Sequence, residues 1–360
     1  MATPKSARVI VVAQWVVVVG AALKAAVSVF RIIATSAPDF FYYYEAAGEV
    51  IRNVPRPIHL LPPASLLVFS PLALLPYEIM EALWILGSFA SLVGIVWFLA
   101  RQSGVTDTRT TLTLVALSYL SFPSQFTLGM GQVNFYALAL IIGAIYYENK
   151  YHRLVMGGLF ALAVLIKPEV ILLLAVLLAY RRWTTLLSVG AWMAGVGIAS
   201  LGVYGFDAYV RYAERMQKAM GTWQDHGIYY NQGITGLLAR MGTTDVISYA
   251  IIAGIIITVT ASAFRKNKIR FPEALWLAMP VFLLVEPIAW QHHFVFLIPT
   301  FFVLWKRNEK KMFRGLLVLG YLLISANVAS PGFFTGLPFG WIPASHGTIG
   351  AIILWLVSIF

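Results

Sequence analysis

Long apolar stretches alternate with short polar ones along almost the whole chain. Twelve apolar runs can be read, at residues 9–30, 62–76, 80–100, 110–122, 133–148, 153–180, 184–205, 245–264, 272–286, 291–305, 314–330 and 345–360. A helix of about 20 apolar residues is long enough to cross the hydrocarbon core of a bilayer. Because the runs are continuous and do not alternate residue by residue, they exclude the strands of a membrane barrel. The pattern predicts an all-α polytopic membrane protein with about 12 transmembrane helices.

Two of these runs contain residues that interrupt helices. Run 62–76 contains four prolines, and run 153–180 contains Lys167 followed directly by Pro168. Such breaks are tolerated in a membrane only where the freed backbone is buried in protein or lines a wet cavity. We therefore expect run 62–76 to dip into the membrane without crossing it. We expect run 153–180 to form two short helices that meet at Lys167.

The distribution of basic residues distinguishes this membrane topology, called the expected threading, from an alternative one. In the expected threading, 17 of the 26 Lys and Arg residues face the cytoplasm and 8 face outward. If 62–76 crossed and 153–180 were one helix, the split would be 13 against 12. Cytoplasmic loops carry an excess of Lys and Arg, so the first threading is preferred, with both termini in the cytoplasm. Three polar regions then face outward, at 31–61, 206–243 and 286–293, and a site is expected there.

The organisation that follows is a single integral membrane domain over residues 1–360. Its parts are a first span (1–30), a first outer loop (31–61), core spans (62–205), a large outer loop (206–243) and C-terminal spans (244–360). The first apolar run resembles a signal peptide but is longer than the usual h-region, which favours an uncleaved anchor.

The composition agrees with a membrane protein and excludes cysteine-based chemistry. The chain is 60% apolar and 11% charged, whereas about a quarter of the residues of a soluble protein are charged. The net charge of +11 follows from the placement of basic residues on one side of the membrane and does not indicate a nucleic acid partner. The chain has no cysteine, which excludes disulfides, thiolate metal ligands and thiol nucleophiles.

The first outer loop carries an acidic residue beside three tyrosines. Pro38 presets the start of a helix, and Asp39, Tyr43 and Ala46 recur at helical spacing, as in an amphipathic helix on the membrane surface. One interpretation of Asp39 is a carboxylate that satisfies backbone donors at a helix N-terminus. The other is a general base that takes a proton from a substrate hydroxyl.

Polar residues at membrane depth form a second group of candidates. Gln132 and Asn134 lie in the segment LGMGQVNFY, where amides commonly hydrogen-bond between helices. An intramembrane lysine such as Lys167 is a functional hypothesis by default, and a structural pair with Glu169 is the alternative.

The turn LLVEPIAWQHHFVFLIP contributes Glu286, Trp290, His292 and His293. Adjacent residues of a helix point about 100° apart, so at most one histidine faces a given ligand. The spacings HxxxH and HExxH are absent, which argues against a zinc site. Imidazoles beside a lipid phosphate are the preferred interpretation.

The loop 206–243 begins with an amphipathic stretch and continues into Trp223, Asn231 and Gln232. Aromatic faces stack on sugar rings, and amides pair with hydroxyl groups. An aromatic belt at the membrane interface is the alternative for the aromatic residues.

Six segments, in this order, resemble those of the GT-C glycosyltransferases and in particular of glycosyltransferase family 87. They are PDFFYYYEAAGEV, LLPPASLLVFSPLALLP with Leu83 and Trp84, GQVN at 131–134, GGLFALAVLIKPEVILL with RRW at 181–183, NQGITGLLAR, and WQHHFVFLIP. The family includes polyprenol-phosphate-mannose-dependent mannosyltransferases of glycolipid synthesis.

The resemblance implies a GT-C-type bundle in the plasma membrane with its active site on the extracytoplasmic side. Such an enzyme takes a sugar, here mannose in the first place, from a polyprenyl monophosphate carrier. It passes the sugar with inversion to a hydroxyl of a lipid-linked or glycolipid acceptor. The implied partners are the bilayer, this sugar donor and this acceptor, and no nucleic acid.

By similarity, Asp39 is the catalytic base, and Lys167 with one of His292 or His293 holds the phosphate of the sugar donor. The residues expected to contact sugar, phosphate or acceptor are Tyr43, Gln132, Asn134, Trp223, Asn231, Gln232 and Trp290. Many relatives carry paired acids in the first outer loop, whereas Phe40 and Phe41 follow Asp39 here. We therefore expect no metal and no cofactor, with cationic side chains neutralising the leaving phosphate.

A transporter or flippase of lipid-linked sugars is the alternative function, since it would use the same cavity without making a bond. The chain shows no clear inverted repeat of the kind that many transporters have, which argues against it. A purely structural subunit fits poorly with Lys167, His292 and His293 in apolar surroundings.

Overall fold

The fold is given by a computed structural model that describes residues 4–52, 61–148, 153–222, 227–243, 245–327, 331–334 and 337–360. Over these residues the chain is helical and forms no strand. One isolated antiparallel bridge joins Asn231 to Trp290. The predicted all-α class is confirmed.

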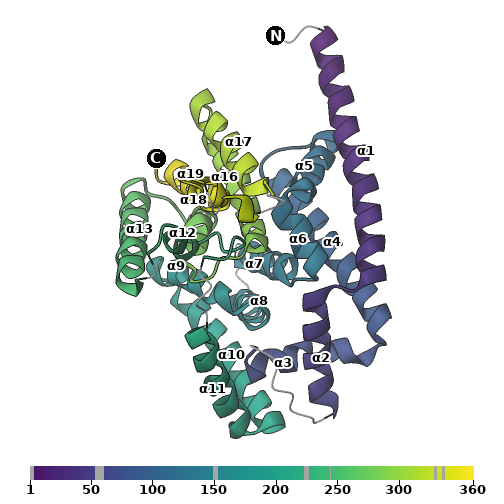
Figure 1. Ribbon diagram of the computed structural model, residues 1–360, viewed down its shortest axis with the longest axis vertical. Coiled ribbons are helices and arrows are strands. Elements are labelled where there is room, and N and C mark those ends of the chain that lie inside the picture. Colours follow the sequence, from purple (N-terminus) through teal and green to yellow (C-terminus); the bar gives the residue numbers. More distant parts are fainter. Residues whose placement is uncertain are drawn as a thin grey trace.

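The N-terminal part is built around one long helix that stands along one side of the molecule, with α2 continuing below it (Figure 1). Its elements are α1 (Pro4–Thr35), α2 (Pro38–Arg52), α3 (Pro63–Phe69), the 3-10 helix η1 (Ser70–Leu74) and α4 (Tyr77–Gln102). α2 packs against η1 and α3, and α1 packs against α5 (Thr108–Leu120). The helix predicted to begin at Pro38 is therefore present.

The middle of the chain contains the central pair α7 and α8, and α8 also packs against α10. The elements here are α6 (Phe122–Met130), α7 (Asn134–Glu148), α8 (Arg153–Ile166), η2 (Pro168–Leu173), α9 (Leu174–Ala179), α10 (Trp183–Tyr204) and α11 (Phe206–Thr222). A helix therefore also stands at the start of the 206–243 loop. That α2 and α11 lie on the membrane surface stays a prediction.

The C-terminal part packs against this middle region through η3, which contacts α6 and α7. Its elements are α12 (Ile234–Arg240), α13 (Val246–Lys266), α14 (Glu273–Leu277), α15 (Met279–Val285), η3 (Gln291–Leu297), α16 (Ile298–Arg307), α17 (Lys311–Ser325), η4 (Pro331–Phe334), α18 (Trp341–Ala344) and α19 (His346–Ile359).

Several helices are long and apolar enough to cross a membrane, as a multi-pass protein requires. In the described part of the chain, α4, α10, α13 and Arg8–Thr35 of α1 meet this test. A fifth span results if α6 and α7, bent by 110°, count as one. Five other apolar segments are only 10–17 residues long. At about 1.5 Å per residue these are shorter than a hydrocarbon core of about 30 Å. The predicted number of about 12 transmembrane helices is therefore not confirmed.

The two interrupted runs break where the sequence indicates. Run 62–76 forms only α3 and η1, and run 153–180 is divided at Lys167 into α8 and the pair η2 and α9. Whether run 62–76 crosses the membrane stays a prediction. The same break at Lys167 delivers a charged side chain into the apolar interior.

Gly131 allows the bend between α6 and α7 to approach α2. It ends α6 with φ +70°, a left-handed conformation that favours glycine. A Cβ atom at this position would lie 2.8 Å from the Cβ atoms of both Ala37 and Phe40. The glycine therefore permits both the bend and the contact with the start of α2.

We expect Gly131→Ala to lower the free energy of unfolding by about 2 kcal/mol, because it adds backbone strain and a clash at one point. Thermal unfolding of the purified protein in detergent measures the effect. Gly129→Ala on the same helix is the matched control, since a Cβ there meets nothing within 4 Å. Equal stability of the two variants would contradict the assignment.

Candidate functional site

The start of α2 is fixed by a buried carboxylate on α4. Glu81 accepts a hydrogen bond from the backbone N–H of Ala37 at 2.5 Å and one from the Tyr77 hydroxyl at 3.1 Å. The sequence alone does not single out Glu81. Its only signal was a lone carboxylate within the apolar run 80–100. Its effect is to hold the first turn of α2, and with it Asp39, against α4.

Asp39 faces the bend between α6 and α7. Its carboxylate accepts a hydrogen bond from Gln132 Nε2, and Gln132 Oε1 in turn accepts one from the Tyr43 hydroxyl at 2.9 Å. Gln132 and Tyr43 are buried, whereas Asp39 is half-buried. Within the described part of the chain, the hydrogen bond to this carboxylate comes from a side chain and not from the backbone of α2. This geometry fits a site residue better than a helix cap.

The pKa of Asp39 is raised above its usual value. Burial is the largest cause, and it outweighs the Gln132 hydrogen bond and the charge of Lys167, which both lower the pKa. The charge of Lys167 therefore reaches the Asp39 carboxylate.

A pH profile of turnover is expected to report this pKa. A base acts only when it is deprotonated, so activity should fall as the pH decreases through the raised pKa of Asp39, at a higher pH than for an exposed aspartate. Gln132→Leu removes a contact that lowers the pKa and should move this acidic limb to higher pH. An acidic limb that stays in place in Gln132→Leu would show that another group controls it.

Lys167 lies at the break between α8 and η2 and is buried within a row of ionisable groups. Its Nζ is 2.8 Å from His293 Nε2 and 3.5 Å from Glu169 Oε1, and His293 Nδ1 is 2.8 Å from Glu286 Oε1. The pairing with Glu169 that the sequence left open is thus present. Lys167 also contacts a histidine 126 positions away in the sequence. These four residues, Glu169, Lys167, His293 and Glu286, are called the charged cluster below.

Three members of the charged cluster could also hold a metal ion. The donor atoms of Glu169, Glu286 and His293 lie within 4.8 Å of one another. Carboxylate and imidazole are suitable ligands for several divalent ions. The Lys167 ammonium, however, already contacts Glu169 and His293 and supplies positive charge in the same place. The expectation that no metal takes part stays a prediction.

The two adjacent histidines have different surroundings. His293 faces Lys167 and Glu286, whereas the His292 ring lies parallel to the Trp290 ring, with centroids 6.4 Å apart. The two imidazole planes are 78° apart. Of the two, His293 is therefore the one that belongs to the charged cluster, and His292 with Trp290 forms its aromatic border.

Asn134 connects the bend to η3. Its Nδ2 donates to the backbone carbonyl of His292 at 2.9 Å, and the Thr127 hydroxyl donates to the same carbonyl at 3.1 Å. Asn134 and Thr127 are fully buried. Asn134 therefore holds the histidine segment against α6 and α7, a contact that the sequence alone does not reveal.

Asn231 and Gln232 are buried and hydrogen-bond to backbone groups of other segments. Asn231 Oδ1 accepts hydrogen bonds from the N–H groups of Gly233 and Ala289, each at 3.2 Å. Gln232 Nε2 donates to the carbonyl of Ala344 at 2.9 Å. These amides connect the 206–243 loop to the histidine turn at Ala289 and to the C-terminal helices at Ala344. Trp223 lies outside the described residues.

The described helices and these residues fit a helical membrane enzyme, in which the charge of a buried lysine beside a buried histidine reaches a half-buried carboxylate. The sequence profile of glycosyltransferase family 87 matches residues 60–331. The chain belongs to glycosyltransferase family 87. The matched region contains Gln132, Lys167 and His293 and begins after α2.

Two curated relatives are similar to the chain over most of its length. A polyprenol-phosphate-mannose-dependent alpha-(1-2)-phosphatidylinositol pentamannoside mannosyltransferase of Mycolicibacterium smegmatis is 28% identical over 296 residues, which cover 80% of this chain and 70% of the relative. A protein of the same description from Mycobacterium tuberculosis is 26% identical over 271 residues, covering 73% of this chain and 61% of that protein. No solved structure gives a significant match.

Proposed function

We propose that this glycosyltransferase moves a mannosyl residue from a polyprenyl monophosphate to a hydroxyl of a glycolipid acceptor, with inversion. The descriptions of the two relatives support the sugar donor and the kind of acceptor. One observation carries the proposal. A half-buried carboxylate that can take a proton lies within the electrostatic reach of a buried lysine that can hold a phosphate.

In the proposed reaction Asp39 acts on the acceptor. The acceptor O–H proton passes to the Asp39 carboxylate while the oxygen bonds to the anomeric carbon of the sugar. The bond between that carbon and the phosphate oxygen breaks, and the bonding pair leaves with the polyprenyl phosphate. The raised pKa of Asp39 makes it a better proton acceptor than an exposed aspartate.

The leaving phosphate gains negative charge as this bond breaks. Lys167 Nζ lies 2.8 Å from His293 Nε2, which accepts one of its N–H groups, and the other N–H groups of the ammonium can be directed at an oxyanion. Burial of both side chains strengthens such an interaction, because little water competes with it. In the proposal Lys167 supplies the counter-charge, in place of a metal ion.

The proposal assigns three of the other predicted contact residues, Gln132, Tyr43 and Trp290, to these two ends. Gln132 joins Asp39 to Tyr43, so it is placed to orient the base and to contact the sugar. Tyr43 stacks on Phe69, and the Trp290 ring lies beside His292. We assign the site to the extracytoplasmic side, on the threading that the basic residues favour.

The direct test uses the purified protein with a radiolabelled mannosyl polyprenyl phosphate and a phosphatidylinositol mannoside. The proposal expects a labelled glycolipid whose new linkage has the opposite anomeric configuration to the sugar donor. Movement of the labelled donor across a vesicle membrane without a new glycosidic bond would instead support the flippase. Transfer of a different sugar from the same carrier would replace mannose in the proposal.

A further inference from the structure

Trp84 of α4 lies in the second of the segments that resemble glycosyltransferase family 87, and it has no part in the proposed reaction. Its indole Nε1 donates a hydrogen bond to the carbonyl of Gly131 at 2.8 Å. Gly131 lies between α6 and α7 and directly precedes Gln132. The Tyr136 hydroxyl of α7 donates to the Trp84 carbonyl at 2.7 Å, so a second hydrogen bond joins α4 to this region. Trp84 is therefore fixed to the residue next to Gln132.

The same face of α4 holds the start of α2. Glu81 lies one turn before Trp84 on this face. It accepts the backbone N–H of Ala37 at 2.5 Å, and Ala37 is two residues before Asp39. Phe40, which directly follows Asp39, is fully buried, and its ring centroid is 5.5 Å from that of Trp84. The chain is therefore held against α4 both before and after Asp39.

We propose that Glu81 and Trp84 are positioning residues for sugar transfer, which together hold Asp39 and Gln132 in register from one helix face. This role rests on the proposed function, in which Asp39 is the base. The two partners of this hydrogen bond lie on different segments, so their geometry depends on a support common to both. α4 is such a support, because Glu81 fixes the start of α2 and Trp84 fixes the bend.

Trp84→Phe tests the indole contact, because it removes the N–H group and keeps an aromatic ring. A small displacement of a catalytic group costs rate, so we expect kcat for transfer to fall about tenfold. The dissociation constant of the sugar donor should stay the same, since Lys167 and His293 lie on other elements. Single-turnover transfer and equilibrium binding measure the two quantities.

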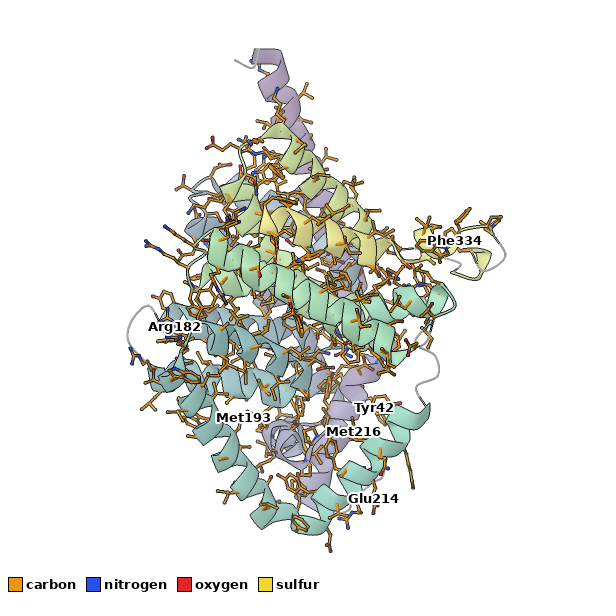
Figure 2. All side chains as sticks on the ribbon, turned by 90° about the vertical axis from the view of Figure 1, so that its left-hand side faces the viewer. Tyr42, Arg182, Met193, Glu214, Met216 and Phe334 are labelled. Carbon is orange, nitrogen blue, oxygen red and sulfur yellow. The ribbon has the colours of Figure 1, made fainter. Side chains whose placement is uncertain are left out.

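Trp192→Phe is the matched control. Trp192 Nε1 also donates to a backbone carbonyl of another helix, that of Leu154 at 3.2 Å. Its chain neighbour Met193 of α10 lies apart from Tyr42 of α2 (Figure 2). Loss of the indole N–H at this position should leave kcat unchanged.

The pKa of Asp39 gives a measurement that needs no substrate. The chain has five aspartates, so a carbon-13 NMR titration of aspartate-labelled protein contains few carboxyl signals, and Asp39→Asn identifies the one of interest. Besides burial, the hydrogen bond of Gln132 and the charge of Lys167 act on this pKa, and both lower it. Because Trp84→Phe frees Gln132 to move, it should raise the pKa of Asp39, whereas Trp192→Phe should not.

A double variant tests whether Trp84 acts through Gln132. In protein that already carries Gln132→Leu, Trp84→Phe should raise the pKa of Asp39 no further. A tryptophan with only a structural role would lower the thermal stability and leave this pKa in place, and that result would overturn the proposal. A full additional rise in the Gln132→Leu protein would overturn it too. If the wild type transferred no mannose, the proposed function would fail, and the titration would still show whether α4 holds Asp39 against Gln132.

Two variants of Glu81 test the other contact. Glutamine keeps an oxygen that can accept the Ala37 N–H, so Glu81→Gln should retain most of kcat. Glu81→Leu is similar in size without an acceptor and should lower kcat about tenfold or more. Equal kcat values for the two variants would overturn the role of Glu81. If Glu81→Leu does not fold, Trp84→Phe and its control still decide the outcome.

Discussion

Asp39→Asn is expected to lower turnover about 10³-fold, which is within the usual range for the loss of a general base. The asparagine retains the size of the side chain and can still hydrogen-bond Gln132, but it cannot accept the proton of the acceptor hydroxyl. Binding of the sugar donor should be nearly unchanged, because Lys167 and His293 are untouched. Single-turnover transfer with radiolabelled donor, measured beside equilibrium binding, separates these two effects.

Tyr43→Phe is the matched control for this prediction. It removes a hydroxyl from the same hydrogen-bonded row, and the Tyr43 ring remains stacked on Phe69. Turnover should fall only severalfold. If Asp39→Asn transferred the sugar at a rate close to the wild type, Asp39 would not be the base.

Lys167→Gln is expected to lower kcat/KM about 10²-fold or more, through weaker binding of the sugar donor and poorer stabilisation of the leaving phosphate. The substitution also leaves the carboxylate of Glu169 without the cation that it contacts. A loss of stability is therefore expected together with the loss of activity. Thermal unfolding must be measured beside the kinetics.

The double variant Lys167→Gln with Glu169→Gln separates the two effects. It removes the cation and one carboxylate together, so it should recover much of the stability but little of the activity. Recovery of transfer by the double variant would show that Lys167 has only a structural role. Activity lost on treatment with a chelator and restored by a divalent ion would assign the counter-charge to a metal at Glu169, Glu286 and His293.

The break at Lys167 and the helix that begins at Pro38 could both be predicted from the sequence, because proline acts locally on the backbone. The predicted number of spans is not confirmed. The break at Lys167 divides run 153–180 into helices shorter than a bilayer, and the bend at Gly131 separates α6 from α7, but hydropathy alone does not indicate a change in chain direction.

Some residues of the candidate site could also be predicted from their residue type. Charged and amide groups in apolar surroundings are rare enough that Lys167, Gln132 and His293 stood out, and the structure brings them close to Asp39 or to one another. The contacts that hold these residues in place could not be predicted from the sequence. Glu81 caps a segment 44 positions away, and Asn231 bonds backbone groups of a turn 58 positions away, so their roles depend on distant contacts.

The carbonyl of His292 accepts from both Thr127 and Asn134, which lie on either side of the bend. These two hydrogen bonds join the bend to the histidine segment, so we expect the two to move together. α2 is joined to the same bend by the hydrogen bonds of Gln132 with Asp39 and Tyr43 and by the close approach at Gly131. Gln132 therefore connects α2 to a unit that also contains the histidine segment, so the position of Asp39 relative to His293 depends on this side chain.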